Sequence, residues 1–462
     1  MSLLLKGGVV VSANERRALD VRIEGEKVVE MGAHLPQQDS EVENVSGLFL
    51  LPGFIDAHTH LELNNGVTTT ADNFETGSKA AIAKGTTTVI DFATPEKGGT
   101  LLECLNTWNH MAKNISSCDY SYHMSIIEWH SALPDEISQM IDKGITSFKM
   151  YMAYDHLRTS DAEIYAAMKE IRKHHGMLGM HCENGDLIDS LISQFIKKGD
   201  RSPHFHPLSR PELAEAEAVN RYLTLAKFAD LPVNIVHLSS ALSLEVVRKF
   251  RATGQKVYVE TCPHYLLLDD TLYDLPDFAS SKYVCSPPLR KKANQVMLWR
   301  GIQMREIDTI STDHCSFHFQ SQKTLGLSDF SKIPNGLPGV ETRPELLYTT
   351  GVITGKITLE RMVELLSEKI ARQFGMFPQK GIIQPQSDAD IVVWDPEKTG
   401  VIAAKTQLQN VDYSPYEGFE TKGAAKAVYL RGKKVAEDGK IIQTKGGKFI
   451  KRGASDYSFL EE

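Results

Sequence analysis

Short β-rich apolar runs alternate with longer helical stretches between residues 50 and 320, and there are eight such runs. The segments between them, such as residues 160–175 and 241–254, carry apolar residues at three- and four-residue spacing, which predicts helices. Eight strand–helix units over about 250 residues indicate an α/β fold of the (β/α)8 barrel type. A doubly wound parallel sheet is the alternative, which the count of eight disfavours. The runs are 53-GFIDAHTH, 86-TTTVIDFA, 120-YSYHMSII, 145-ITSFKMYM, 177-MLGMHC, 233-VNIVHLSS, 256-KVYVETCP and 308-DTISTDHC.

The two ends of the chain show a different pattern, in which apolar and polar residues alternate between Gly and Asn turns, as in short antiparallel strands. Neither end is long enough to bury a core alone. We therefore expect residues 1–50 and 384–443 to join into one small β-sandwich domain beside a catalytic barrel of residues 51–383. Residues 444–462 lack periodicity, and we expect an extended C-terminal tail that is either disordered or wrapped on a partner subunit.

Charge, hydropathy and cysteine content argue against a nucleic-acid-binding, membrane-spanning or secreted protein. A net charge of -8, with acidic and basic residues interspersed, argues against a nucleic-acid partner. No apolar run approaches the roughly 18 residues that a membrane span needs, and the N-terminal segment has neither the basic lead nor the cleavage site of a signal peptide. The six cysteines are scattered without a CxxC pair, so we expect free, packed thiols and a cytoplasmic location.

Unusual polar side chains occur where the predicted strands end. His58 and His60 stand on alternate positions of the first run, so they project from the same side of a strand. In a barrel the C-terminal ends of the strands meet on one face, where barrel enzymes build their sites. Four imidazoles and a carboxylate on that face suit zinc or a similar divalent metal. The other residues of this set are Lys149 in the fourth run, His181 in the fifth, His237 in the sixth and Asp313 in the eighth.

Lys149 does not fit a metal site as an ammonium, because a cation repels the metal. One interpretation is that its side chain extends to the surface from an apolar strand. The other is that burial between Phe148 and Met150 lowers its pKa. A neutral amine can add carbon dioxide, and the resulting carbamate could bridge two metals.

Several motifs in order resemble the dihydropyrimidinase/hydantoinase branch of the cyclic amidohydrolases, from residue 1 to about residue 440. The resemblance implies a (β/α)8 barrel with a β-sandwich built from both termini, two divalent metal ions, usually zinc, and a homo-oligomer, commonly a tetramer. The motifs are PGFIDAHTH, FKMYMAY, MHCENGDLI, VHLSSALSLEVV, VCSPPLR, STDHCSF and PNGLPGVETR.

The resemblance also implies a role for each site residue. His58, His60 and Asp313 would hold one metal, His181 and His237 the other, and Lys149 would bridge them as N6-carboxylysine. The Tyr154 hydroxyl would donate to the developing oxyanion, and Asp313 would act as general base and then general acid. Backbone groups of Ser286 and Asn335 would pair with the substrate ring. His264 and His314 would support the ligands.

The implied reaction is hydrolysis of the ring amide of a small cyclic ureide, a hydantoin or a 5,6-dihydropyrimidine, to an N-carbamoyl amino acid. Dihydroorotase is disfavoured because no Arg occurs from Leu61 to Ala112 to hold a substrate carboxylate. An allantoinase-like activity stays open. A non-enzymatic scaffold is disfavoured because every ligand position is retained.

Relatives of the implied family commonly carry an aromatic residue just after the first metal motif, whereas this chain has Glu62, Asn64 and Asn65, with Leu63 between Glu62 and Asn64. We expect the loops at residues 63–69, 94–99 and 154–158 to form the pocket for the ring substituent.

Overall fold

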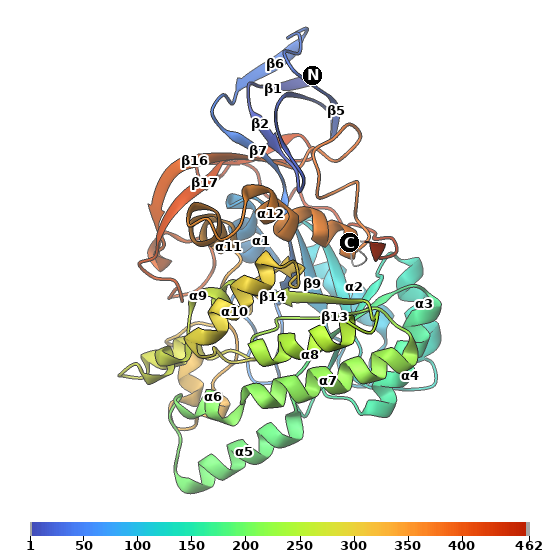
Figure 1. The fold of residues 1–462 in the computed structure, drawn as a ribbon, viewed down its shortest axis with the longest axis vertical. Helices are drawn as coiled ribbons and strands as arrows, with labels where there is room; N and C mark the ends of the chain where they lie inside the picture. The colour runs from blue at the N-terminus through green and yellow to red at the C-terminus, as the bar shows by residue number, and fades with distance from the viewer. Residues whose placement is uncertain (1, 459–462) are drawn as a thin grey trace.

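The computed structural model describes residues 2–458, and its centre is a parallel barrel (Figure 1). Its eight strands neighbour one another in sequence order. A bridge between Thr59 and His314 joins the last strand to the first. Buried Arg343 links the same two strands, because its Nη1 donates to the carbonyls of Ile55 and Ile310 at 2.8 and 2.9 Å. The predicted (β/α)8 architecture is confirmed. The strands are β8 (Phe54–Thr59), β9 (Thr86–Ala93), β10 (Asp119–Ser125), β11 (Ser147–Tyr151), β12 (Met177–His181), β13 (Val233–Ile235), β14 (Val257–Thr261) and β15 (Thr309–Ile310).

Helices cover the outside of the barrel, and several begin at a residue that the sequence marks clearly. The side chains of Thr100 and Ser160 each accept a hydrogen bond from the backbone N–H of a glutamate three residues on. The side chain of that glutamate in turn accepts from the backbone N–H of the threonine or serine. Within residues 2–458 no helix is long and apolar enough to cross a membrane. The helices are α1 (Phe74–Ala83), α2 (Leu101–Ala112), α3 (Leu133–Asp142), α4 (Asp161–Lys173), α5 (Gly185–Lys198), α6 (Phe205–Ser209), α7 (Glu212–Ala229), α8 (Ala241–Arg251), α9 (Pro263–Leu267), α10 (Lys292–Gln303), α11 (Arg343–Leu347), α12 (Leu359–Val363) and α13 (Lys369–Gln373).

Two barrel strands are shorter than the apolar runs that predict them. β13 spans three residues and β15 only two. The backbone leaves the extended conformation soon afterwards, with positive φ at His237 (40°) and Asp313 (50°). Both strands therefore end early so that the chain can turn a polar side chain inward.

Strands from both ends of the chain build the second domain, as predicted. β7 pairs with β16 in antiparallel register, so residues 49–52 lie beside residues 391–394. A seven-stranded sheet of β19-β18-β17-β16-β7-β2-β3 faces a four-stranded sheet of β5-β4-β1-β6, both above the barrel in Figure 1. The domain limits proposed from the sequence remain predictions. The strands are β1 (Ser2–Lys6), β2 (Val9–Val11), β3 (Arg16–Ala18), β4 (Asp20–Glu24), β5 (Lys27–Gly32), β6 (Ser40–Asn44), β7 (Phe49–Pro52), β16 (Ile391–Val401), β17 (Glu420–Leu430), β18 (Lys433–Glu437) and β19 (Lys440–Ile441).

The C-terminal tail packs on the barrel of its own chain as far as the structure describes it. The N–H of Tyr120 donates to a tail carbonyl at 2.9 Å, and the N–H of Ile450 donates back to Tyr120 at 2.8 Å. Arg452 is buried and donates to side chains at the starts of β10 and β11. The described part of the tail is therefore ordered on its own barrel, and its contact with a partner subunit stays a prediction. Residues 459–462 lie outside the described range.

A buried ion cluster joins the barrel, the tail and the sandwich domain. Lys380 Nζ lies 2.5, 3.0 and 2.6 Å from carboxylate oxygens of Asp119, Asp388 and Asp390. These three carboxylates converge as a metal site would, but the Lys380 ammonium group already lies between them as their shared cation. Arg431, from the sandwich domain, also pairs with Asp119.

We predict that Lys380→Met destabilises the protein strongly, because it leaves buried carboxylates without their cation. Breaking a buried pair from one side costs about 3–5 kcal/mol. Lys398→Met is the matched control, since Lys398 pairs with Asp438 on the surface, where a pair contributes less than about 1 kcal/mol. Urea unfolding followed by circular dichroism measures both, and equal stability losses would contradict the prediction.

Candidate metal centre

All of the predicted site residues line one pocket of about 260 Å³ at the C-terminal ends of the barrel strands. They arrive from different strands and from the loops that follow them, which a closed parallel barrel brings to one face. Convergence of residues that lie far apart in sequence makes this pocket the candidate functional site. These lining residues are His58, His60, Leu63, Asn64, Asn65, Lys149, Tyr154, His181, His237, Ser286, Asp313 and Asn335.

His58, His60 and Asp313 form the first cluster at the base of the pocket. The Nε2 atoms of His58 and His60 lie 3.1 and 3.2 Å from the same Oδ1 of Asp313. The opposite nitrogen of His58, Nδ1, lies 2.6 Å from Glu260 Oε1. A carboxylate only accepts, so Nδ1 carries a hydrogen. In a neutral ring the lone pair of Nε2 then faces the Asp313 oxygen.

His181 and His237 form the second pair. His181 Nε2 lies 2.9 Å from Glu183 Oε2, so it carries the hydrogen and leaves Nδ1 as an acceptor. Nδ1 of His181 lies 3.0 Å from Nε2 of His237, while His237 Nδ1 is buried and has no hydrogen-bond partner in the described part of the chain. Burial, with the nearby Lys149 ammonium, holds the pKa of His237 well below its usual range.

These donor atoms fit a divalent cation. The ligand atoms of the first cluster all lie within 4.8 Å of one another, and lone pairs aimed at a carboxylate repel it unless a positive charge lies between them. A proton can supply that charge at His58, where burial lowers the pKa but Glu260 and Asp313 raise it to about 9. One metal ion satisfies both imidazoles and the carboxylate together, with nitrogen and oxygen ligands that zinc prefers.

Lys149 lies beside these clusters and does not reach the surface, because it is only 1% exposed. Its Nζ lies 5.0 and 5.4 Å from the ring centroids of Phe92 and Tyr151. Burial lowers the pKa of this amine to about 8, although Asp313 and Glu260 act in the opposite direction. The interpretation of Lys149 as a surface-reaching side chain is therefore wrong. A substantial fraction of the amine is neutral near pH 8.

Three of the site residues have a strained backbone. Tyr154, His237 and Asp313 have φ of 70°, 40° and 50°, in the left-handed region that residues other than glycine seldom adopt. Tyr154 also packs on His181, with ring centroids 5.0 Å apart, and against the Arg210 guanidinium. Burial raises the pKa of its hydroxyl, which therefore stays protonated and available as a donor.

Two carboxylates that position the histidines are absent from the sequence-based prediction. Glu260 lies near the end of β14, a barrel strand to which no site residue is assigned from the sequence, and its Oε1 also accepts from the His237 N–H at 3.1 Å. Glu183 follows His181 by two residues and pairs with Arg210 at 2.6 Å. An acidic residue at the end of an apolar strand was the available signal for Glu260.

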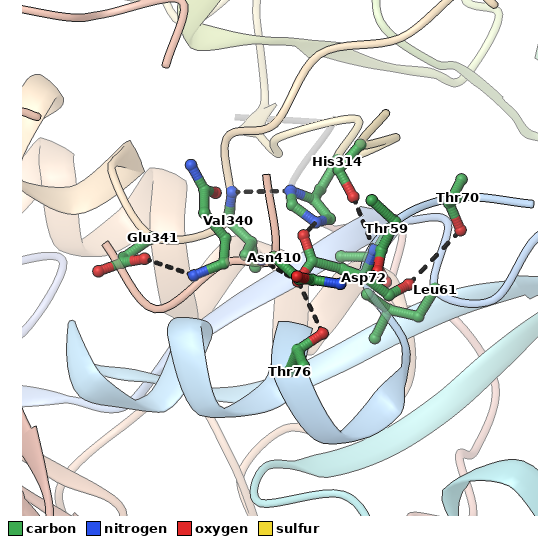
Figure 2. Close-up of polar contacts among 12 residues, drawn as sticks. Thr59, Leu61, Thr70, Asp72, Thr76, His314, Val340, Glu341 and Asn410 are labelled. Atoms are coloured by element: carbon green, nitrogen blue, oxygen red, sulfur yellow. Dashed lines mark hydrogen bonds and ion pairs between the residues drawn. The ribbon is translucent and has the colours of Figure 1, made fainter. Parts of the chain in front are cut away.

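His314 belongs to a buried hydrogen-bond network whose side-chain contacts do not include the metal-ligating residues, and its support of the ligands stays a prediction (Figure 2). Its Nδ1 accepts from the N–H of Gly339 and Val340, so its Nε2 donates to Asp72 at 3.1 Å. Asp72 also accepts from the N–H of Asn410 at 2.7 Å. The network thus ties the strand end that carries Asp313 to a segment near the sandwich domain. His264 is buried, but it makes no hydrogen bond to a ligand within residues 2–458.

Comparison with known proteins defines the class. Residues 49–435 match the amidohydrolase family. A D-hydantoinase of Streptomyces coelicolor is 41% identical over 461 residues, which is 98% of each chain. The solved dihydropyrimidinase of Brevibacillus agri NCHU1002 superposes with a TM-score of 0.97 at 40% identity, covering 98% of this chain and 99% of that one. An L-hydantoinase of Arthrobacter aurescens superposes with a TM-score of 0.89 at 28% identity, covering 97% and 99%.

The chain therefore belongs to the amidohydrolase family. Within it, the protein is an enzyme of the hydantoinase and dihydropyrimidinase branch, a cyclic amidohydrolase. The family is metal-dependent, in agreement with the donor atoms at the base of the pocket.

We predict that Glu260→Gln weakens binding of a divalent metal about 10–100-fold, because the amide no longer fixes the tautomer of His58. Competition with a chromogenic chelator measures this affinity without relying on turnover. Glu245→Gln is the control, since Glu245 lies on α8 with its side chain 52% exposed. Unchanged metal affinity in Glu260→Gln would contradict the positioning role.

Proposed function

We propose that this enzyme hydrolyses the ring amide of a hydantoin or a 5,6-dihydropyrimidine to an N-carbamoyl amino acid. The observation that carries the proposal is the burial of two facing sets of metal-ligating atoms, around His58 and around His181, at the base of one pocket. The names of relatives about 40% identical over the whole chain support the substrate class. Allantoin is the alternative ureide. We further propose two zinc ions per chain, a homotetramer and a cytoplasmic location.

His58, His60 and Asp313 would hold one metal, and His181 and His237 the other. When bound, the two metals supply a water that loses its proton near neutral pH, and they polarise the scissile carbonyl. Lys149 would join the ligands as a carbamate. Its neutral amine adds carbon dioxide and loses a proton, which converts a buried amine into an anion with two oxygens.

The remaining chemistry falls to side chains and backbone groups of the pocket. Asp313 would take the proton of the attacking water and return it to the ring nitrogen as the ring C–N bond breaks. The Tyr154 hydroxyl would donate to the carbonyl oxygen as negative charge develops there. Backbone groups of Ser286 and Asn335 would pair with the flat ureide edge, which orients the ring. The product carries the new carboxylate and the N-carbamoyl group.

The D configuration is the preferred substrate in this proposal. Relatives named D-hydantoinase are up to 41% identical to this chain, whereas the solved L-hydantoinase is 28% identical.

Initial rates on a panel of hydantoins, 5,6-dihydropyrimidines and allantoin test the activity, with metal content measured on the same preparation. We expect ring opening of hydantoin or dihydrouracil, and about two metal ions per chain. Turnover confined to allantoin would replace the proposed substrate class with the alternative one.

We predict that Asp313→Asn retains metal but loses at least about 10²–10⁴-fold in turnover, because an amide cannot carry the proton. Asp142→Asn, at the exposed end of α3, is the control for loss of one carboxylate. Near-native turnover of Asp313→Asn would refute the proton-transfer role.

We predict that Lys149→Ala and Lys149→Arg both lose most of the bound metal. The first removes the amine, and the guanidinium of the second stays protonated and cannot take up carbon dioxide. Metal analysis of the purified variants gives the result, and Lys169→Ala on α4 is the exposed control. Native mass spectrometry of the wild type tests the carbamate directly. A bare amine in a metal-loaded, active enzyme would exclude the bridge.

A further inference from the structure

The outer part of the pocket is lined by loops rather than by strand ends, and four of its polar side chains bear hydrogen-bond donors. Asn64, Asn65 and His156 lie on the loops predicted to hold the ring substituent. Lys332 lies on a further loop, residues 331–336, of which the sequence-based prediction included only Asn335. All four side chains bear hydrogen-bond donors.

The asparagine side chains turn their acceptors away from the pocket. Asn64 Oδ1 accepts from the N–H of Gly66 at 2.9 Å. Asn65 Oδ1 accepts from the N–H of Val67 at 3.0 Å and of Thr68 at 2.9 Å. The loop thus uses both carbonyl groups for its own turn. Within residues 2–458, neither amide NH₂ group donates to another residue.

Among residues 2–458, Lys332 is the only charged side chain of the pocket lining outside the metal clusters. Its ammonium forms no ion pair or hydrogen bond with the part of the chain that the structure describes. His156 is exposed and is likewise without a hydrogen-bond partner there. Positive charge and free donors therefore lie together at the outer pocket.

Carboxylates on the same loops are engaged elsewhere. Asp155 pairs with Arg158 at 2.6 Å. Asp329 accepts from the N–H and the hydroxyl of Ser331 at 3.0 and 2.6 Å. Asp313, the only carboxylate that lines the pocket, belongs to the metal cluster. The outer pocket is therefore rich in donors and lacks an anion of its own.

We propose that the substrate carries an anionic ring substituent, a carboxylate at the end of a short aliphatic chain. Leu63, Leu157 and Ile333 line the same pocket and would contact the methylene groups. The carboxylate would lie against Lys332 and the asparagine amides. An aryl substituent would instead cover these donors without satisfying them, which costs free energy. The inference rests on the proposed function, because it assumes that the ring binds over the metal clusters.

Two substrates of equal size test the inference on the metal-loaded enzyme. One is hydantoin with a carboxyethyl group on the substituted ring carbon, and the other has a carbamoylethyl group in its place. We expect kcat/KM to be higher for the carboxylate by up to about fivefold, mainly through a lower KM, as one partly exposed ion pair allows. The preference should shrink at high salt, because exposed charges are screened.

Lys332→Gln should lower the ratio of the two kcat/KM values toward one, by raising the KM for the carboxylate. Lys249→Gln is the matched control, since it removes one positive charge from the exposed last turn of α8 and does not line the pocket. The control should keep the wild-type ratio.

The outcomes separate the inference from the proposed function. If the enzyme opens none of the substituted or unsubstituted hydantoins and no dihydrouracil, the proposed function is wrong. If it opens either ring but prefers the carbamoylethyl or a phenyl substituent, only the inference of an anionic substituent is overturned. A preference for the carboxylate that is identical in wild type and Lys332→Gln would also overturn it.

Discussion

Glu260 holds the centre of this enzyme together, because one of its oxygens contacts both halves of the metal site. Oε1 lies 2.6 Å from the ring of His58 and accepts from the backbone N–H of His237 at 3.1 Å. A buried carboxylate needs compensating charge or hydrogen bonds. Here it gains both from the residues that it orients, so the two histidine clusters are arranged by one anion behind them.

The rigid barrel makes this arrangement of buried polar residues possible. Closure between β8 and β15 fixes the strand ends, and Arg343 spans the joint from inside the protein. A rigid frame can hold residues at unfavourable backbone angles, as at His237 and Asp313. The short last strand is thus part of the site, since the chain stops pairing where Asp313 must turn toward the histidines.

The periodicity of the sequence predicted the architecture well, because parallel strands buried on both faces form continuous apolar runs. The residues at the strand ends also met in one pocket, as the geometry of a barrel requires. Glu260 was not predicted as a site residue, because a glutamate at a strand end is not distinctive until its contacts with His58 and His237 are known. The packing of the C-terminal tail on the barrel was not predicted either, because its hydrogen bonds with Tyr120 join backbone groups, which leave no pattern in the sequence.

The pairing of β7 with β16 has a consequence for how the molecule is made. Residues 49–52 lie beside residues 391–394, so one edge of β7 gains its partner β16 only after the barrel has been synthesised, although β7 can pair earlier with β2 on its other edge. Contacts of such long sequence separation are slow to form. Until then, the N-terminal strands expose unpaired edges, which are prone to aggregate. The seven-stranded sheet is therefore completed only when residues 391–394 reach the free edge of β7.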